Sequence, residues 1–420
     1  MARQTCHRHR NPLDERRQAE PRPRIDYGVR LMSFLAWIDF DQADRDRTRR
    51  IMDLFGQEDS RDELGLGSVR DALADLMFPG TSTIQTRLRY MLFVPWVYQL
   101  AGAQRGVANA RRDLARALEI RLIDTLVRGG ETQNVIGSAA REKLKRLPSD
   151  VYWAGLLTLG IRRFQGSRNA CLEATPGEAA KLWAAGLPQA PNGFLSSPDS
   201  TADFQLTKEE SGFLRDRLAQ ESPESLFTWL TRQTSAANCD MIWQHPARAD
   251  WPDQIRIVVD HAERFSGLMH GASLLYNLML SEKAAQMQVM ENSSWHERVA
   301  TYTAKLDEWA QKTPTHLFEG WDLADLWMLS QGTIHDVKPH SRRFIEIWRD
   351  IVVESQGNVR EKAAARALVR DREMRLKGPK SRFRNDGALM RWSGASGTVP
   401  LNFRWKPVVA NHVKDLVDAG

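Results

Sequence analysis

The stretch FPGTSTIQTRLRYMLFVPW, residues 78–96, joins a turn, a run of hydroxyl groups, two arginines and a long apolar end. Pro79 removes a backbone donor and Gly80 tolerates left-handed dihedral angles, so this pair is expected to end the helix before it. A second helix is expected to follow and to run to a kink at Pro95. Three hydroxyl side chains can cap its first turn: Thr81, Ser82 and Thr83.

Two arginines of this stretch, Arg87 and Arg89, lie beside apolar residues. They either pair with carboxylates inside the fold or face a polyanion. The second interpretation has a physical basis, because the unbonded N–H groups and the dipole of a helix N-terminus attract phosphate. Hydroxyl groups followed by arginines therefore make residues 81–89 a candidate phosphate contact. The alternative is a capped helix with ion-paired arginines.

Helical periodicity dominates the rest of the chain. In residues 108–130 leucines recur every fourth position from Leu114, and Gly129 fits the C-cap, so this segment is the clearest helix. Residues 138–164 are expected to form two helices with a short turn between them, as in a helix-turn-helix or a simple helical hairpin. Strand patterns are few. The sequence predicts a mainly α, multi-helical fold with a helix-turn-helix-like hairpin and few short strands.

Composition divides the chain into five segments. Residues 1–31 are rich in Arg and Pro and poor in apolar residues, which predicts a disordered N-terminal extension, with a translation start at Met32 as the alternative. Residues 186–206 are rich in Pro, Gly and Ser, which predicts a linker or a long surface loop. The other three are an N-terminal helical domain, a central helical domain and a basic C-terminal segment: residues 32–185, 207–359 and 360–420.

The net charge of +6 is unevenly distributed. Residues 1–30 carry +4 and residues 360–406 carry +9, whereas residues 31–359 carry −6. The body is mildly acidic and the positive charge lies at the two ends. That asymmetry favours a polyanionic partner for the ends and a protein partner for the body.

The C-terminal segment interleaves cations with aromatic rings, as single-strand or duplex-end binding requires. The alternative is a subdomain that packs its rings and pairs its arginines with the acidic body. The candidate contacts are Lys380, Arg382, Arg384, Arg391, Trp392, Arg404, Trp405 and Lys406.

Signatures of catalysis are missing from the sequence. The P-loop pattern GxxxxGK[ST], the strand–GxGxxG–helix unit and the GxSxG elbow do not occur, so neither a cofactor nor a metal is expected. A metal-dependent nuclease or hydrolase built on Asp39, Asp71 or Asp75 remains an alternative. Three widely spaced cysteines favour a reducing cytoplasm, and no stretch approaches the ~20 apolar residues of a membrane-spanning helix.

Four stretches resemble an uncharacterised bacterial domain-of-unknown-function family: WIDF (37–40), ELGLGSVRDALADLMFPGTSTIQTRLRYMLFVPWVY (63–98), RLPSDVYWAGLLTLGIR (146–162) and GASGTVPLNFRW (394–405). The resemblance covers residues 33–166 and 381–416. It implies gene neighbours of the helicase and phospholipase-D-like nuclease classes in antiphage defence islands. It supplies no catalytic residues.

These observations lead to one hypothesis and two rivals. The leading hypothesis is a cytoplasmic, non-enzymatic accessory subunit of a DNA-processing or antiphage defence system. It binds nucleic acid through the basic C-terminus and docks helicase or nuclease partner proteins through the acidic body. The rivals are a structural scaffold that does not contact nucleic acid and the metal-dependent nuclease or hydrolase.

Overall fold

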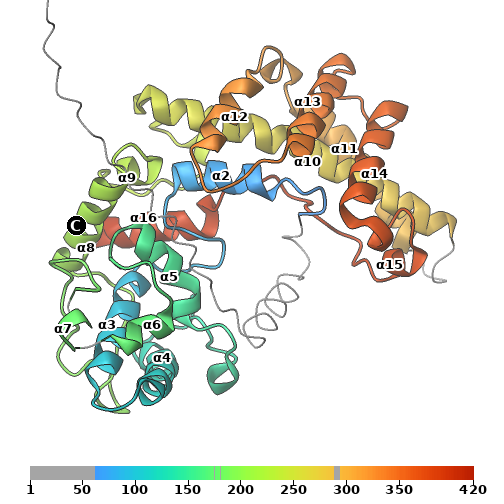
Figure 1. The fold of residues 1–420 in the computed structure, drawn as a ribbon. Helices are drawn as coiled ribbons and strands as arrows, with labels where there is room; N and C mark the ends of the chain where they lie inside the picture. The colour runs from blue at the N-terminus through green and yellow to red at the C-terminus, as the bar shows by residue number, and fades with distance from the viewer. Residues whose placement is uncertain (1–61, 175, 180, 288–293) are drawn as a thin grey trace, which may run out of the picture. The chain divides into compact units, whose positions relative to one another are not determined.

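The computed structural model describes residues 62–174, 176–179, 181–287 and 294–420. The predicted N-terminal extension and Asp39 lie outside these ranges. The mainly helical prediction is confirmed, since the described residues hold no strand beyond one isolated bridge between Arg162 and Trp183. The α-helices, labelled as in Figure 1, are α2 (Gly67–Met77), α3 (Tyr90–Ala103), α4 (Ala108–Arg128), α5 (Pro148–Thr158), α6 (Arg168–Glu173), α7 (Pro176–Ala179), α8 (Lys208–Glu221), α9 (Leu226–Leu230), α10 (Asp253–Gln286), α11 (Ser294–Lys312), α12 (Leu323–Gln331), α13 (Pro339–Glu354), α14 (Ala363–Lys377), α15 (Asp386–Met390) and α16 (Ala410–Asp418).

Helix α3 forms the centre of one group of helices, and α4, α5 and α6 pack against it. Every side chain from Tyr90 to Tyr98 is buried, as expected of a helix that is apolar on all sides. The helix continues through Pro95 to Ala103. The apolar half of the stretch 78–96 therefore lies at the core of this group.

Helix α10, 34 residues long, forms the centre of a second group, against which α2, α11, α13 and α14 pack. Helix α11 lies close to it at one point for a steric reason. A Cβ on Gly271 would lie 2.3 Å from the Trp309 ring, so only glycine lets this ring lie against the helix. The indole Nε1 of Trp309 donates to the carbonyl of Gly267 at 2.8 Å, which fixes the ring in place.

The C-terminal helix α16 returns to α8 and α9, and Figure 1 shows the three side by side. The guanidinium of Arg215 on α8 donates to the carbonyl of Leu416 at 2.7 Å. The ring of His412 stacks on Phe227 of α9 with centroids 6.3 Å apart. The end of the chain is therefore built into the core formed by much earlier residues.

The predicted helix capped by one of residues 81–83 is present only from Tyr90 onward, as α3, and its predicted first part is wrong, because residues 81–89 form a loop. Distant side chains bind the amides of this loop. The hydroxyl of Tyr152 accepts from the N–H of Thr86 at 2.9 Å, and a carboxylate oxygen of Asp415 accepts from the N–H of Leu88 at the same distance. Tertiary contacts here replace the bonds that a helix would have made.

The predicted hairpin at residues 138–164 is replaced by a shorter arrangement. Its first half holds a 3-10 turn over Arg141–Lys143, in which Arg141 has φ 44°, and a left-handed residue interrupts an α-helix. Its second half is α5, which begins at Pro148, where the sequence places the break.

Residues 186–206 hold no helix and pack on α3 and α4. The carbonyl of Pro188 accepts from the indole of Trp96 at 2.7 Å, and Arg121 of α4 donates to the carbonyl of Leu195 at 2.8 Å. The side chains of Phe194 and Phe204 are buried. Although the described residues all belong to one compact unit, the proposed division into two helical domains stays a prediction.

His412 on α16 is fully buried, and neither ring nitrogen has a hydrogen-bond partner among the described residues. Burial lowers its pKa to about 3, and the nearby Arg87 guanidinium acts in the same direction. The unfolded chain keeps an ordinary pKa of about 6.5 and takes up a proton first as pH falls. The stability that the neutral His412 contributes is therefore fully present above pH 6.5. This contribution is lost as the pH falls below that value.

We expect His412→Phe to remove the loss of folding stability at low pH that His412 causes, because phenylalanine fills a similar space and does not titrate. Relative to the parent protein, the free energy of unfolding of the variant should rise by about 2 kcal/mol between pH 8 and pH 5. Urea titrations of both proteins at the two pH values measure this. A difference that stays constant with pH would contradict the assignment.

Candidate nucleic-acid interface

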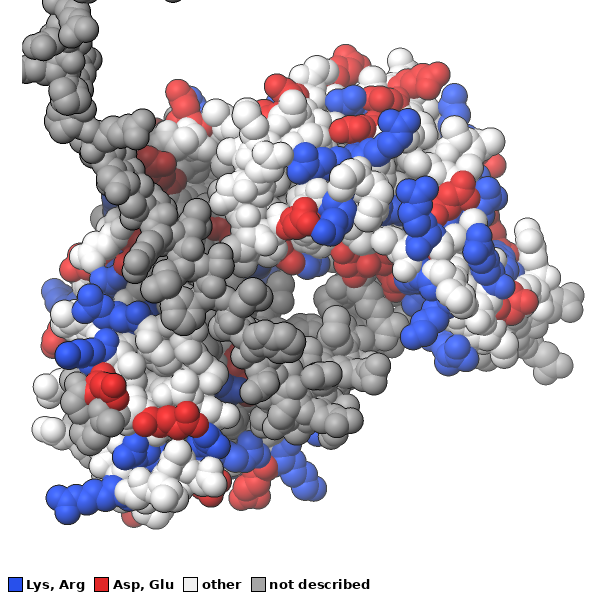
Figure 2. Space-filling view, viewed as in Figure 1, with Lys and Arg blue, Asp and Glu red and all other residues white. Residues whose placement is uncertain are grey.

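Lysine and arginine side chains gather where α14 and α15 lie at the surface, with a few carboxylates among them (Figure 2). The sequence predicts two sets of nucleic-acid contacts, residues 81–89 and part of the C-terminal segment. The structure sorts these residues into inner cations, whose partners are carboxylates of the chain itself, and outer cations, which point to solvent.

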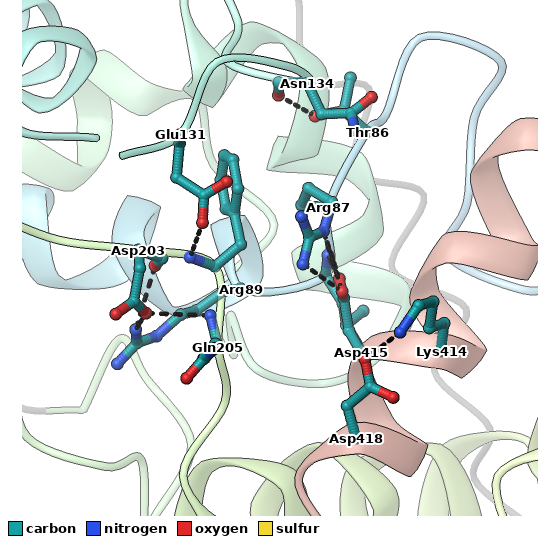
Figure 3. Close-up of polar contacts among 12 residues, drawn as sticks. Thr86, Arg87, Arg89, Glu131, Asn134, Asp203, Gln205, Lys414, Asp415 and Asp418 are labelled. Atoms are coloured by element: carbon teal, nitrogen blue, oxygen red, sulfur yellow. Dashed lines mark hydrogen bonds and ion pairs between the residues drawn. The ribbon is translucent and has the colours of Figure 1, made fainter. Parts of the chain in front are cut away.

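Arg87 and Arg89 both belong to the inner cations (Figure 3). Arg87 Nε lies 2.8 Å from a carboxylate oxygen of Asp415 on α16, whose carboxylate is buried. Burial raises the pKa of Asp415, and the bonds from Arg87 and from the amide of Leu88 oppose this rise. Arg89 is buried and contacts Asp203 at 2.7 Å and Glu210 at 2.8 Å.

The hydroxyl residues of the loop differ in exposure. Thr81 is buried and its hydroxyl donates to the carbonyl of Phe78 at 2.7 Å. The hydroxyl of Ser82 is buried without a described partner, whereas Thr83 is exposed. Because no helix begins here, the loop lacks the row of amides from which a phosphate contact was inferred. A role of this set in nucleic-acid binding stays a prediction, without that support.

Arg404 joins the C-terminal segment to α2. Its guanidinium bonds to Asp75, lies 3.7 Å from Asp71, and donates to the carbonyl of Thr81 at 2.8 Å. Its side chain is only 9% exposed. Asp75 also accepts from His335 Nε2 at 2.7 Å. Arg404 therefore connects the C-terminal segment to α2 and to the loop after α2 through ion pairs and a hydrogen bond.

Arg382 is the second inner cation of the C-terminal segment. One guanidinium nitrogen lies 2.9 Å from a carboxylate oxygen of Glu63 and donates to the hydroxyl of Tyr276 at 2.7 Å. Lys377 pairs with the same buried Glu63. Glu373, also buried, accepts from the amide of Arg382 at 2.9 Å. The negative charges of Glu63 and Glu373 thus balance the positive charges of Lys377 and Arg382.

The aromatic residues predicted to stack on bases are packed inside the protein. Trp405 is 1% exposed and its indole donates to the carbonyl of Cys239 at 2.9 Å. Trp392 is buried against Trp295, with ring centroids 5.8 Å apart. Lys406, beside them, is partly exposed and pairs with Asp240 at 2.9 Å. Residues 360–420 therefore expose no tryptophan face.

The outer cations lie on the same stretch of chain and point to solvent. Their side chains are exposed, and no carboxylate of the described ranges pairs with them. Arg384 contacts the sulfur of Met374 at 3.2 Å. The outer cations are Arg375, Lys380, Arg384 and Arg391. Arg375 is not among the contacts predicted from the sequence, although the run of basic residues in 360–377 indicates it.

A hollow of about 550 Å³ opens between the end of α14 and α15. The outer cations Lys380 and Arg391 line it, together with the inner cations Lys377 and Arg382. Its other lining residues are Leu376, Asn385 and Ala388, so its wall contains no carboxylate. Since the two inner cations are already balanced, Lys380 and Arg391 leave the hollow positive.

Asp71 and Asp75, the candidates for a metal-dependent reaction, serve as partners of cations. Asp71 pairs with Arg70 at 2.9 Å and Asp75 with Arg404 and His335. Within residues 62–420 and outside the gaps named above, no three His, Cys, Asp or Glu side chains converge to hold a metal ion.

The described residues define a mainly helical protein with a basic surface on its C-terminal segment. None of its described helices combines the length and apolar character needed to cross a bilayer. The chain belongs to a family of unknown function, DUF6361, whose model matches residues 32–420. No curated protein and no solved structure matches the chain.

We expect Asp415→Asn to cost about 3 kcal/mol in the free energy of unfolding, because Arg87 would keep its charge in a partly buried place without a counter-ion. Urea denaturation followed by circular dichroism measures this. The matched control is Asp418→Asn on the same helix, whose exposed pair with Lys414 should contribute less than about 0.5 kcal/mol. Equal effects of the two changes would show that burial of the pair is unimportant.

We expect Arg404→Met to lower the free energy of unfolding by about 3 kcal/mol, because it leaves Asp75 without its guanidinium partner. Arg384→Met removes an exposed cation and should change stability by less than about 0.5 kcal/mol. The same denaturation assay compares them. A stable Arg404 variant, or an Arg384 variant that is as unstable, would contradict the division into inner and outer cations.

Proposed function

We propose that this protein binds nucleic acid through the outer cations of α14 and α15, as a non-enzymatic accessory subunit of a DNA-processing or antiphage defence system. One observation supports the proposal most directly. Four exposed cations follow one another within 17 residues, Arg375–Arg391, and no described carboxylate pairs with them. Unpaired cations gathered on a small area attract a polyanion more strongly than the same charges interspersed with carboxylates.

The chemistry of this surface favours the phosphate backbone as the contact. Arginine and lysine bind phosphate oxygens without reading the sequence. Trp392 and Trp405 are buried, so they do not offer a face for base stacking. The proposed binding is therefore independent of sequence and depends steeply on salt.

The accessory role rests on the family resemblance. Helicases and phospholipase-D-like nucleases, the gene neighbours that the resemblance implies, act on nucleic acid. A subunit that binds the phosphate backbone and docks a helicase or nuclease on its acidic body is consistent with such gene neighbours. The cytoplasm, where these enzymes act, is the proposed location.

The scaffold is a second candidate, and the inner cations favour it. Arg87, Arg89, Arg382 and Arg404 each contact carboxylates of the chain itself, as expected if the basic residues hold the fold together. In that case the outer cations bind nothing in particular and serve solubility. The two candidates differ in one measurable property, the response of DNA binding to the outer cations.

Fluorescence anisotropy with a labelled 30-base-pair duplex, titrated between 25 and 200 mM salt, tests the proposal. Four phosphate contacts predict a slope of log K against log [salt] of about −3.6. The triple variant Lys380→Ala, Arg384→Ala and Arg391→Ala should reduce the slope to about −1 and weaken low-salt binding at least about tenfold.

A matched triple variant controls for net charge: Arg105→Ala, Lys143→Ala and Lys145→Ala. These three cations are also exposed and have no described carboxylate partner, and their removal changes the net charge by the same amount. This variant should bind like the parent protein. If both variants weaken binding equally, the attraction is unspecific. If the parent protein does not bind DNA at 25 mM salt, the scaffold is the correct candidate.

A further inference from the structure

A cavity of about 470 Å³ lies between α10 and α11, apart from the basic surface. Segments distant in sequence also line it: the turn at 313–318, residues 241–244 and residues 398–400. Its volume lies within the range of small-molecule sites, which are built preferentially between packed elements. We call it the Trp309 pocket, after the tryptophan in its wall.

The walls of this pocket are aromatic and fixed in position. Trp309 is 4% exposed, and its bond to the carbonyl of Gly267 holds the ring against α10. Phe318 is buried, and Trp243 is partly exposed with its ring edge-on to Phe403. Of these three rings Trp243 keeps exposed surface in the pocket wall, and it favours a flat ligand, because stacking on a fixed ring requires no ordering of the protein on binding.

The charges around the pocket are positive once internal pairs are removed. Glu308 pairs with Lys312, whereas Glu263 shares Arg248 with Asp260. These pairs together leave one negative charge, which the two further cations of the wall outnumber. Arg264 on α10 and Lys305 on α11 line the same pocket, and no carboxylate of the described ranges pairs with either. The planar guanidinium of arginine suits carboxylate and phosphate oxygens.

We propose that the Trp309 pocket binds a small molecule that combines a flat aromatic ring with one anionic group. The ring lies against Trp243, and the anion contacts Arg264 and Lys305. Nucleoside monophosphates and aromatic carboxylic acids share this chemistry. The proposal does not depend on nucleic-acid binding by the outer cations.

Gly267 lines the pocket, and a larger residue at this position would fill it. A Cβ on Gly267 would lie 3.7 Å from Phe318 and 3.8 Å from Thr313, which is ordinary van der Waals contact. Gly267→Leu is therefore compatible with the helix, where leucine is favoured over glycine, and its side chain fills the pocket. The matched control is Gly212→Leu in α8, where an added Cβ meets no atom within 4 Å.

Isothermal titration calorimetry with the full chain tests the proposal with paired probes. Adenosine and guanosine 5′-monophosphate are compared with their nucleosides, and indole-3-acetate is compared with indole. We expect at least one anionic probe to bind more tightly than its neutral partner, and the pair that binds identifies the source of the ligand. If no anionic probe binds at millimolar concentration, or if the neutral partners bind as tightly, the proposal is overturned.

Three variants then locate the bound probe. Gly267→Leu should abolish binding with unchanged or higher thermal stability, whereas Gly212→Leu should leave binding intact. Arg264→Gln should weaken the anionic probe about tenfold and leave the neutral partner unchanged, because it removes a charge-assisted bond and little else. Binding that survives Gly267→Leu, or an equal effect of Arg264→Gln on both probes, would refute this location.

Discussion

The structure depends on buried and partly buried arginines that pair with carboxylates from distant parts of the chain. Arg404 and Asp75 are 329 residues apart in sequence, and Arg87 and Asp415 are 328 apart. A buried charge without a partner is costly, so each pair forms only when both segments are in place. These pairs therefore fix the C-terminal segment and α16 onto helices formed much earlier in the chain.

This constraint changes the meaning of the charge distribution. The excess of +9 in residues 360–406 suggests a strongly basic surface, but Arg382, Arg404 and Lys406 contact carboxylates of the preceding residues. Part of the acidic character of the body serves as the counterpart of these cations. The charge available to an external partner is smaller and more concentrated than the sequence suggests.

Local patterns predicted some of the helices, since spacing and turn residues act over a few positions. The segment from Ala108 to Arg128 is helical and ends at Gly129, as its leucine spacing and C-cap predicted. The start of α3 was misplaced because Tyr152 and Asp415 bind the amides of the loop before it. Likewise, nothing near Arg382 in sequence reveals Glu63 as its partner. The sequence therefore shows the basic segment, while its division into inner and outer cations required the three-dimensional structure.

The inner and outer cations have complementary roles. Lys377 and Arg382 bind Glu63, and the amide of Arg382 binds Glu373 of α14, so these bonds hold the end of α14 and the chain leading to α15. Lys380 and Arg391 project from that braced backbone into one hollow. A cation on a fixed backbone loses less conformational freedom when it binds a phosphate than one on a mobile tail. Buried ion pairs that contribute to the fold thus also hold the backbone of the exposed cations in place, which would favour the proposed binding of a polyanion.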